Sequence, residues 1–124
     1  MDKETFAKRL AQSMTHTSES LVAGAQHPTG RGVSAERSAL AAWLHGLDDE
    51  GRKWVHHLVD EGVHAGVFGL LCVLDHVRFV EDGDQKGSFT LTYTAPTGAQ
   101  TQINPDKGEM LHDLYNGLRR EAQK

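Results

Sequence analysis

The chain has 124 residues, of which 38% are hydrophobic and 24% are charged. This size and balance are typical of one folded domain, so we expect a single domain over residues 1–124 rather than a disordered chain. Seventeen acidic against thirteen basic residues give a formal net charge of −4 with the histidines neutral. Because the basic residues also do not cluster, the sequence disfavours nucleic-acid binding.

The sequence shows no targeting or membrane segment. The N-terminal residues lack the apolar region of a signal peptide, and no uninterrupted apolar stretch approaches the ~20 residues of a membrane span. We therefore expect a cytoplasmic protein that does not bind a membrane. The only cysteine, Cys72, lies in an apolar run, where a thiol usually behaves as a small buried side chain.

Two helices are predicted before residue 48. Asp2 or Thr5 could cap the first helix, and the polar stretch 26–32, which contains proline and two glycines, predicts the loop that follows. Ser34 stands at the N-cap position of the second helix and Gly46 at its end. The first helix carries an apolar stripe of Phe6, Leu10, Met14, Leu21 and Val22. The stripe expected to be buried on the second is Leu40, Trp43, Leu44 and Leu47.

Asp48, Asp49 and Glu50 put negative charge where a third helix would begin, which favours a helix start. Its buried stripe is predicted to be Trp54, Val55, Leu58, Val59 and Gly62. From Val67 to Val80 the pattern loses its polar face, which is typical of a buried central helix. That helix could continue the third one or be separated from it near Gly66.

The period then changes to two. Phe89, Leu91 and Tyr93 alternate with threonines, Pro96 to Gly98 predicts a turn, and the chain returns over 101–103, which together indicate a β-hairpin with one apolar face. A last helix is predicted with Met110, Leu111, Leu114 and Leu118 turned inward. The predicted fold class is therefore α+β and mainly helical, with four to five helices and one C-terminal β-hairpin packed on the helical core.

Eight histidines are the compositional surplus of this chain. His56, Asp60 and His64 are spaced at i, i+4 and i+8 and share one helix face, a spacing that suits a divalent transition metal. The predicted buried stripe lies almost opposite, so this face, with the adjacent His57, is expected to meet solvent. The alternatives are a solvated polar face, a partner-binding surface, or a metal site at His56, Asp60 and His64. No cofactor is expected.

The acidic residues that precede the histidines extend this surface. Asp48, Asp49 and Glu50 would cap the helix or meet a basic partner, for which charge would assist association. The candidate partner-binding residues are therefore Asp48, Asp49, Glu50, His56, His57, Asp60 and His64.

A second group of polar residues lies in apolar surroundings. Asp75 has Arg78 at a helical ion-pair spacing, and a buried histidine such as His76 or His112 with an aspartate partner could act as a general base. No nucleophile accompanies them, because Cys72 is expected to be buried and no Gly-x-Ser-x-Gly turn occurs. A structural role is therefore favoured over catalysis.

Several C-terminal segments resemble a known group of proteins: Leu71–Arg78, Gly87–Tyr93, Ile103–Asn104 and Leu111–Asn116. They are similar to small bacterial proteins of unknown function, some of which look like immunity proteins that neutralise a toxin. The resemblance covers mainly residues 67–118, and such proteins commonly have glycine where this chain has His76. It implies a compact cytoplasmic protein that binds another protein, and it carries over no functional residue.

We therefore expect a noncatalytic, immunity-like protein-binding module that neutralises a toxin partner. The alternative is a small metal-binding protein or enzyme that uses its surface histidines. A homodimer joined through the hairpin or the third helix is a third hypothesis.

Overall fold

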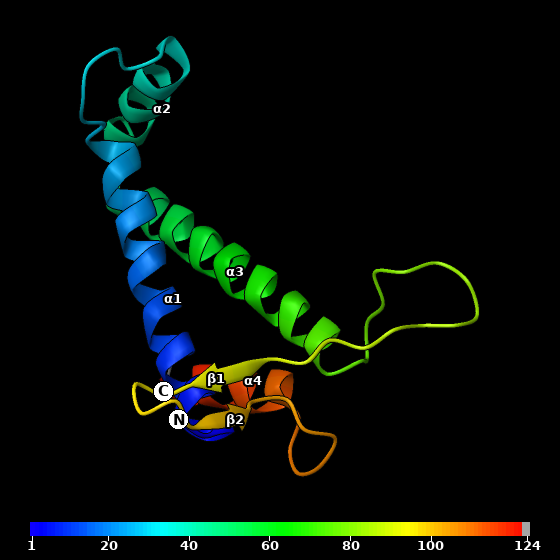
Figure 1. Ribbon diagram of the computed structural model, residues 1–124. Coiled ribbons are helices and arrows are strands. Elements are labelled where there is room, and N and C mark those ends of the chain that lie inside the picture. The colour runs from blue at the N-terminus through cyan, green and yellow to red at the C-terminus, as the bar shows by residue number, and fades with distance from the viewer. Residues whose placement is uncertain (123–124) are drawn as a thin grey trace. The chain divides into compact units, whose positions relative to one another are not determined.

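The computed structural model describes residues 1–122. Its elements, in chain order, are α1 (Lys3–Gln26), α2 (Ala35–His45), α3 (Asp49–Leu74), β1 (Thr92–Thr94), β2 (Gln100–Gln102) and α4 (Leu111–Ala122) (Figure 1). The predicted α+β, mainly helical class with one hairpin near the C-terminus is confirmed.

The chain divides into two compact units. One contains Met1–Gln12 together with the chain from Ala65 onward, and the other contains Ser13–His64. We call them the hairpin unit and the α2 unit. Since α1 and α3 each contribute to both units, the expectation of one domain over residues 1–124 stays a prediction.

The helix starts follow the predicted capping residues. The Asp2 carboxylate accepts a hydrogen bond from the Thr5 amide at 2.8 Å, and this bond lowers the pKa of Asp2 below its ordinary value. Ser34 caps α2 by accepting from the Arg37 amide. Asp48 accepts from the Gly51 amide at the start of α3, at 2.7 Å. Each cap satisfies an amide that the first helical turn leaves without an internal partner.

α3 passes through Gly66 without a break and ends at Leu74, so the predicted buried helix through Val80 is wrong beyond that residue. His76 has a φ of +60°, in the left-handed region that commonly ends a helix. The amides of His76 and Val77 donate to the carbonyls of Val73 and Cys72, which is the bonding of a Schellman cap. The C-terminal carbonyls of α3 are thereby satisfied, and the chain leaves the helix axis.

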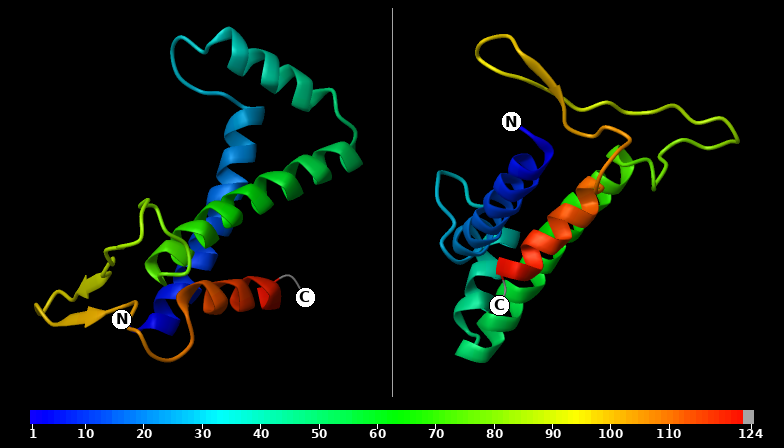
Figure 2. Two further views of the ribbon diagram at one scale, coloured as in Figure 1. Left: turned by 90° about the vertical axis from the view of Figure 1, so that its right-hand side faces the viewer. Right: turned by 90° about the horizontal axis from the view of Figure 1, so that it is seen from below.

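The core of the hairpin unit combines residues of α1, α3, β1 and α4 with Ile103, which directly follows β2. The buried cluster is Ala11, Leu71, Ile103, Leu111 and Tyr115, with Leu91 and Tyr93 of the hairpin packed against it. The His112 ring also meets the Phe68 ring edge to face, with centroids 5.5 Å apart, where the start of α4 lies beside the C-terminal part of α3 (Figure 2). The predicted packing of the hairpin on helices is therefore confirmed, and Tyr115 is a core residue that the sequence-based prediction missed.

The hairpin is antiparallel, with Tyr93 opposite Thr101. Gly98, at a φ of +89°, provides the turn, where its amide donates to the Ala95 carbonyl. Only three residues of each strand pair regularly, although the predicted alternation begins at Phe89. The Leu91 carbonyl still accepts from the Ile103 amide. The strands are short because the Asn104 side chain, rather than a strand, bonds the Leu91 amide and the Phe89 carbonyl.

One helix among the described residues, α3, is long and apolar enough by length and composition to cross a membrane. One such helix is weak evidence of a membrane span, because the core helices of soluble proteins meet the same criterion. The finding does differ from the sequence-based prediction, which identified no stretch of that kind.

Candidate functional site

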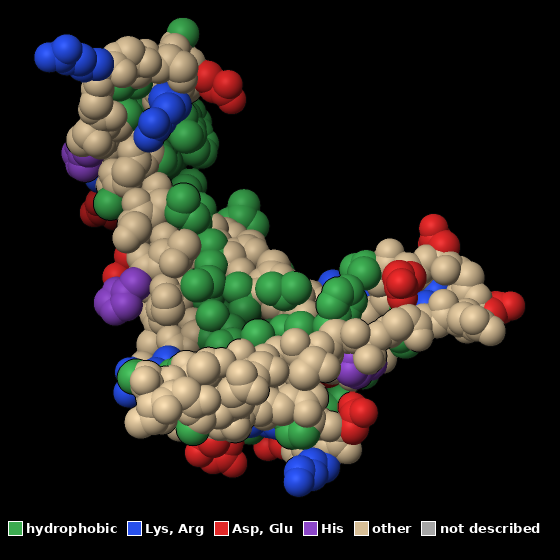
Figure 3. Space-filling view, viewed as in Figure 1, with side chains coloured by type: hydrophobic (Ala, Val, Ile, Leu, Met, Phe, Trp, Pro, Cys, Tyr) green, Lys and Arg blue, Asp and Glu red, His purple; other side chains and the backbone are tan. Residues whose placement is uncertain are grey.

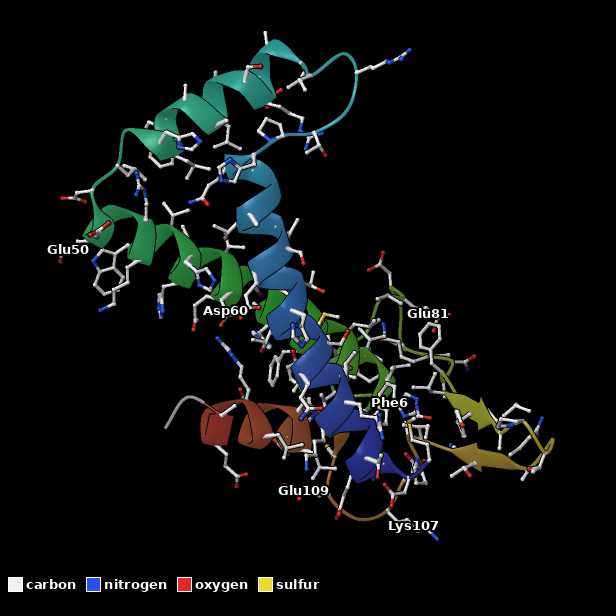
Figure 4. The ribbon with its side chains drawn as sticks, turned by 90° about the vertical axis from the view of Figure 1, so that its left-hand side faces the viewer. Phe6, Glu50, Asp60, Glu81, Lys107 and Glu109 are labelled. Atoms are coloured by element: carbon white, nitrogen blue, oxygen red, sulfur yellow. The ribbon has the colours of Figure 1, made fainter. Side chains whose placement is uncertain are left out.

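The predicted partner-binding residues lie on the first half of α3 and the turn before it, within the α2 unit. Asp48 is a helix cap. Asp49 is fully exposed and lies 3.9 Å from the Arg52 guanidinium, and Glu50 is exposed at the start of the helix (Figure 4). Asp49 and Glu50 therefore remain available to a partner, while the Asp48 carboxylate already has a structural role.

The histidines of this segment do not share one environment. His56 and His57 are exposed, but His64 is only 2% exposed and its Nε2 lies 3.4 Å from Oδ1 of Asp60. The prediction that all three metal-ligand candidates face solvent is therefore wrong for His64. The structure pairs Asp60 with His64, and within residues 1–122 it forms no group of three His, Cys, Asp or Glu side chains that could hold a metal ion.

The side of α3 that packs differs from the predicted buried stripe. Trp54 is 56% exposed and Leu58 is 73% exposed, whereas Val55 and Val59 are half-buried. The prediction failed here because the apolar side of α3 is wider than the side that packs. A similar error occurs on α2, where Leu44 is buried but Leu40 and Trp43 are about half exposed.

Trp54 and Leu58 belong to one exposed helix face. Residues three, four, seven and eleven positions apart lie on the same side of a helix, which places five exposed residues together. We call this the Trp54 face: Glu50, Trp54, His57, Leu58 and Glu61. The His57 ring meets the Trp54 ring edge to face, with centroids 5.7 Å apart, and Nζ of Lys53 lies 5.8 Å from the Trp54 ring centroid.

Asp75 and His112, two of the polar residues predicted in apolar segments, meet in the hairpin unit. One Asp75 carboxylate oxygen accepts from the Leu111 amide at 3.1 Å, and the other accepts from the His112 amide at 2.8 Å. Nδ1 of His112 lies 2.6 Å from that second oxygen. Asp75 therefore caps α4 from the end of α3. The predicted helical ion pair with Arg78 does not form, since Arg78 follows the left-handed turn and lies against Gly69.

Asn104 organises the same region. Its side-chain oxygen accepts from the Leu91 amide, and its nitrogen donates to the carbonyls of Leu74 and Phe89 at 2.7 and 2.8 Å. With a residue exposure of 3%, this amide joins the end of α3 to the chain that enters β1. The sequence singled out Asn104 only within the resembling segment, because an isolated asparagine after a strand gives no spacing signal.

A cavity of about 190 Å³ adjoins these residues and is lined in part by Lys3, Asp75, Asn104 and Met110. Its polar groups are already engaged: Lys3 donates to the carbonyls of Lys107 and Glu109, and Asp75 and Asn104 are bonded as described above. Figure 4 shows Lys107 and Glu109 near the start of α1. The geometry is that of a structural brace rather than an acid/base site.

Cys72 gives no nucleophile to this region. The residue is 6% exposed, and burial raises the pKa of its thiol, with the Arg78 charge acting in the opposite direction. The Cys72 side chain therefore stays a protonated thiol at neutral pH. The predicted burial of this side chain is confirmed.

A further surface was missed by the sequence-based prediction. Val77, Phe79, Val80 and Phe89 were assigned to a buried helix or to the apolar face of the hairpin, but all four are about half exposed or more. Three of them lie in a segment without regular structure, residues 77–88, which we call the 77–88 loop, and Phe89 directly follows it. The loop extends beyond the end of α3 (Figure 1).

Comparison with known proteins found no matching family model, no matching curated protein and no matching solved structure.

Proposed function

We propose that this chain is a noncatalytic protein-binding module and that the Trp54 face contacts its partner. The observation that carries the proposal is the exposure of Trp54 and Leu58, at 56% and 73%, on a regular helix. Large apolar side chains displayed together mark interaction sites more often than isolated exposed ones, and tryptophan is enriched among residues that dominate binding energy.

The charges around this face indicate what would bind. Glu50 and Glu61 lie on the same side of α3 as Trp54, and Asp49 is exposed at the start of the helix. These three carboxylates outnumber the single ammonium near the Trp54 ring, that of Lys53. A partner with an apolar pocket bordered by lysine or arginine would complement this arrangement, and the opposite charges would raise the association rate. A helix face needs little reorganisation before binding, which reduces the ordering cost of association.

We further propose that the partner is a toxin and that the chain neutralises it by binding. The resemblance of residues 67–118 to immunity-like proteins supports this proposal, because it implies a compact protein that acts by binding another protein. The proposal needs only a stable scaffold and a complementary surface.

The test is growth rescue. Genes that flank the gene of this chain are expressed singly in a bacterial host, with and without the chain. We expect one of them to arrest growth and the chain to restore it. The proposal is overturned if the chain relieves the toxicity of none of them.

A matched pair of substitutions on one helix tests the surface itself. Leu58→Asp and Leu70→Asp both place a charge at an exposed leucine of α3, since Leu70 is 60% exposed. We expect Leu58→Asp to abolish rescue and Leu70→Asp to preserve it, with both proteins folded by circular dichroism. Equal rescue by the two variants would remove the Trp54 face from the proposal.

A further inference from the structure

We infer that the 77–88 loop is a second docking surface, built to bind a basic protein segment that carries apolar side chains. The loop belongs to the hairpin unit, whereas the Trp54 face belongs to the α2 unit. The inference therefore stands independently of the proposed function.

The loop displays apolar side chains that a purely connecting segment would not need. Phe79 is 54% exposed, Val80 is 67% exposed, and Val77 and Phe89 flank them at 49% and 48%. Connecting loops are usually polar, because Gly, Pro, Asn, Asp and Ser satisfy the turn geometry. Three large exposed apolar side chains on one loop, with a fourth directly after it, are typical of an interaction site.

The loop is also held in shape by its own contacts. At its base, the Phe89 amide donates to Nε2 of His76 at 3.1 Å. Within it, the Glu81 carboxylate accepts from the Gly87 amide at 2.7 Å, and Lys86 donates to the Glu81 carbonyl. Loops whose ends are close and whose own side chains brace them are frequently functional, and a braced loop loses less conformational entropy on binding.

The charges of the loop select the partner. The Lys86 ammonium is already used, because it bonds the Glu81 carbonyl and lies 5.7 Å from the Phe79 ring centroid. Asp82 and Asp84 are exposed, and neither makes a hydrogen bond or ion pair with the described residues. Figure 3 shows acidic side chains at the outer end of this loop and hydrophobic ones nearer its base.

A partner that covers Phe79 and Val80 would bring its own charges close to Asp82 and Asp84. Lysine or arginine at those positions would be attracted, and acidic groups would be repelled. The same two carboxylates oppose insertion into an anionic lipid surface, where basic residues are favoured. The observations therefore favour a basic, apolar protein segment over a membrane.

The experiment is selection of a random peptide display library on the immobilised full chain, followed by affinity measurement with the enriched peptides. We expect peptides that combine lysine or arginine with aromatic or aliphatic residues. Their affinity should fall about tenfold or more for Phe79→Ser, and about threefold or more for Asp82→Asn combined with Asp84→Asn, with the charge effect shrinking as salt increases.

Two controls test whether binding is specific to the 77–88 loop. Leu70→Ser, which also changes an exposed apolar residue of the hairpin unit, should leave peptide affinity unchanged. Trp54→Ala should also leave it unchanged, so that failure of the proposed function and failure of this inference are distinguishable. Circular dichroism and a urea melt verify that each variant is folded.

Three results would overturn the inference. The first is enrichment of peptides without basic residues, or of peptides whose affinity Phe79→Ser does not alter. The second is cosedimentation of the chain with phosphatidylcholine or phosphatidylglycerol vesicles that Phe79→Ser abolishes, which would assign the loop to lipid. The third is a dimer in sedimentation equilibrium that Phe79→Ser dissociates, which would assign it to a second copy of this chain.

Discussion

Nδ1 of His112 lies 2.6 Å from a carboxylate oxygen of Asp75, and the same carboxylate accepts the amides of Leu111 and His112. The Asp75 side chain is 6% exposed and that of His112 is 13% exposed. An aspartate beside a histidine is often interpreted as part of a catalytic group, but here the carboxylate completes the first turn of α4. Asp75 and His112 are 37 residues apart along the chain, and their contact joins the end of α3 to the start of α4.

Asp75→Ala is therefore expected to destabilise the protein. The substitution leaves two amides and the His112 ring without their acceptor, so the free energy of unfolding should fall by roughly 1–3 kcal/mol. A urea melt followed by circular dichroism measures the change. Asp84→Asn is the control, because that side chain has no partner among residues 1–122 and its substitution should change the free energy of unfolding by less than about 0.5 kcal/mol.

Asn104 is predicted to be at least as sensitive. Asn104→Ala removes one acceptor and two donors that bond the backbone of Leu91, Leu74 and Phe89 from a buried position. Its free energy of unfolding should be lower by roughly 2–4 kcal/mol. Hydrogen exchange at the Leu91 amide should accelerate in the same variant. If Asn104→Ala unfolded at the same urea concentration as Gln100→Ala, an exposed change on the neighbouring strand, the bracing role of Asn104 would be disproved.

His76 allows backbone strain to be separated from side-chain bonding. Its left-handed conformation costs a non-glycine residue about 1–2 kcal/mol, while its ring supplies the acceptor for the Phe89 amide. His76→Gly loses the bond but relieves the strain, so its free energy of unfolding should stay close to that of the parent. His76→Ala loses the bond and keeps the strain.

We expect His76→Ala to be less stable than His76→Gly by about 1 kcal/mol in paired urea melts. Exchange of the Phe89 amide should accelerate in both. Equal stability of the two variants would show that the turn is not left-handed in solution.

Cys72 yields a prediction about pH. Its pKa is raised in the folded state, so the folded protein retains the proton at pH values where the unfolded chain has lost it. The contribution of Cys72 to stability is therefore complete below the ordinary thiol pKa of 9.0 and is lost as pH rises above it. Between neutral and alkaline pH, the free energy of unfolding of a Cys72→Ser variant should fall less than that of the parent protein.

Alkylation checks the same environment more directly. Native protein should react with iodoacetamide far more slowly than urea-unfolded protein at neutral pH, because burial both covers the sulfur and keeps it protonated. Rapid modification of native protein would contradict the buried position of Cys72.

The fold was largely predictable because it depends on local signals. The caps at Asp2, Ser34 and Asp48 and the glycine turn at Gly98 are encoded by single residues with specific bonding requirements. The end of α3 was not predictable from hydrophobicity, since Val77, Phe79 and Val80 continue the apolar pattern of the helix. There a Schellman cap at His76 decided the path of the chain, and a left-handed histidine leaves little trace in the sequence.

The candidate site was predicted only in part for a related reason. Periodicity identifies an apolar helix face, but it cannot show which section of a wide face packs. Trp54 and Leu58 were assigned to the interior, and Val55 and Val59 occupy the packed side instead. His64 was consequently assigned to solvent although it is buried beside Asp60.

Acrylamide quenching of Trp54 is the sharpest test of the proposed binding face. The chain has two tryptophans, so Trp43→Phe leaves Trp54 as the single reporter on that face. We predict red-shifted emission and quenching almost as efficient as in the urea-unfolded chain, because the indole is displayed to solvent. Blue-shifted emission that acrylamide barely quenches would place Trp54 in the interior and contradict the proposal that this helix face is free to bind a partner.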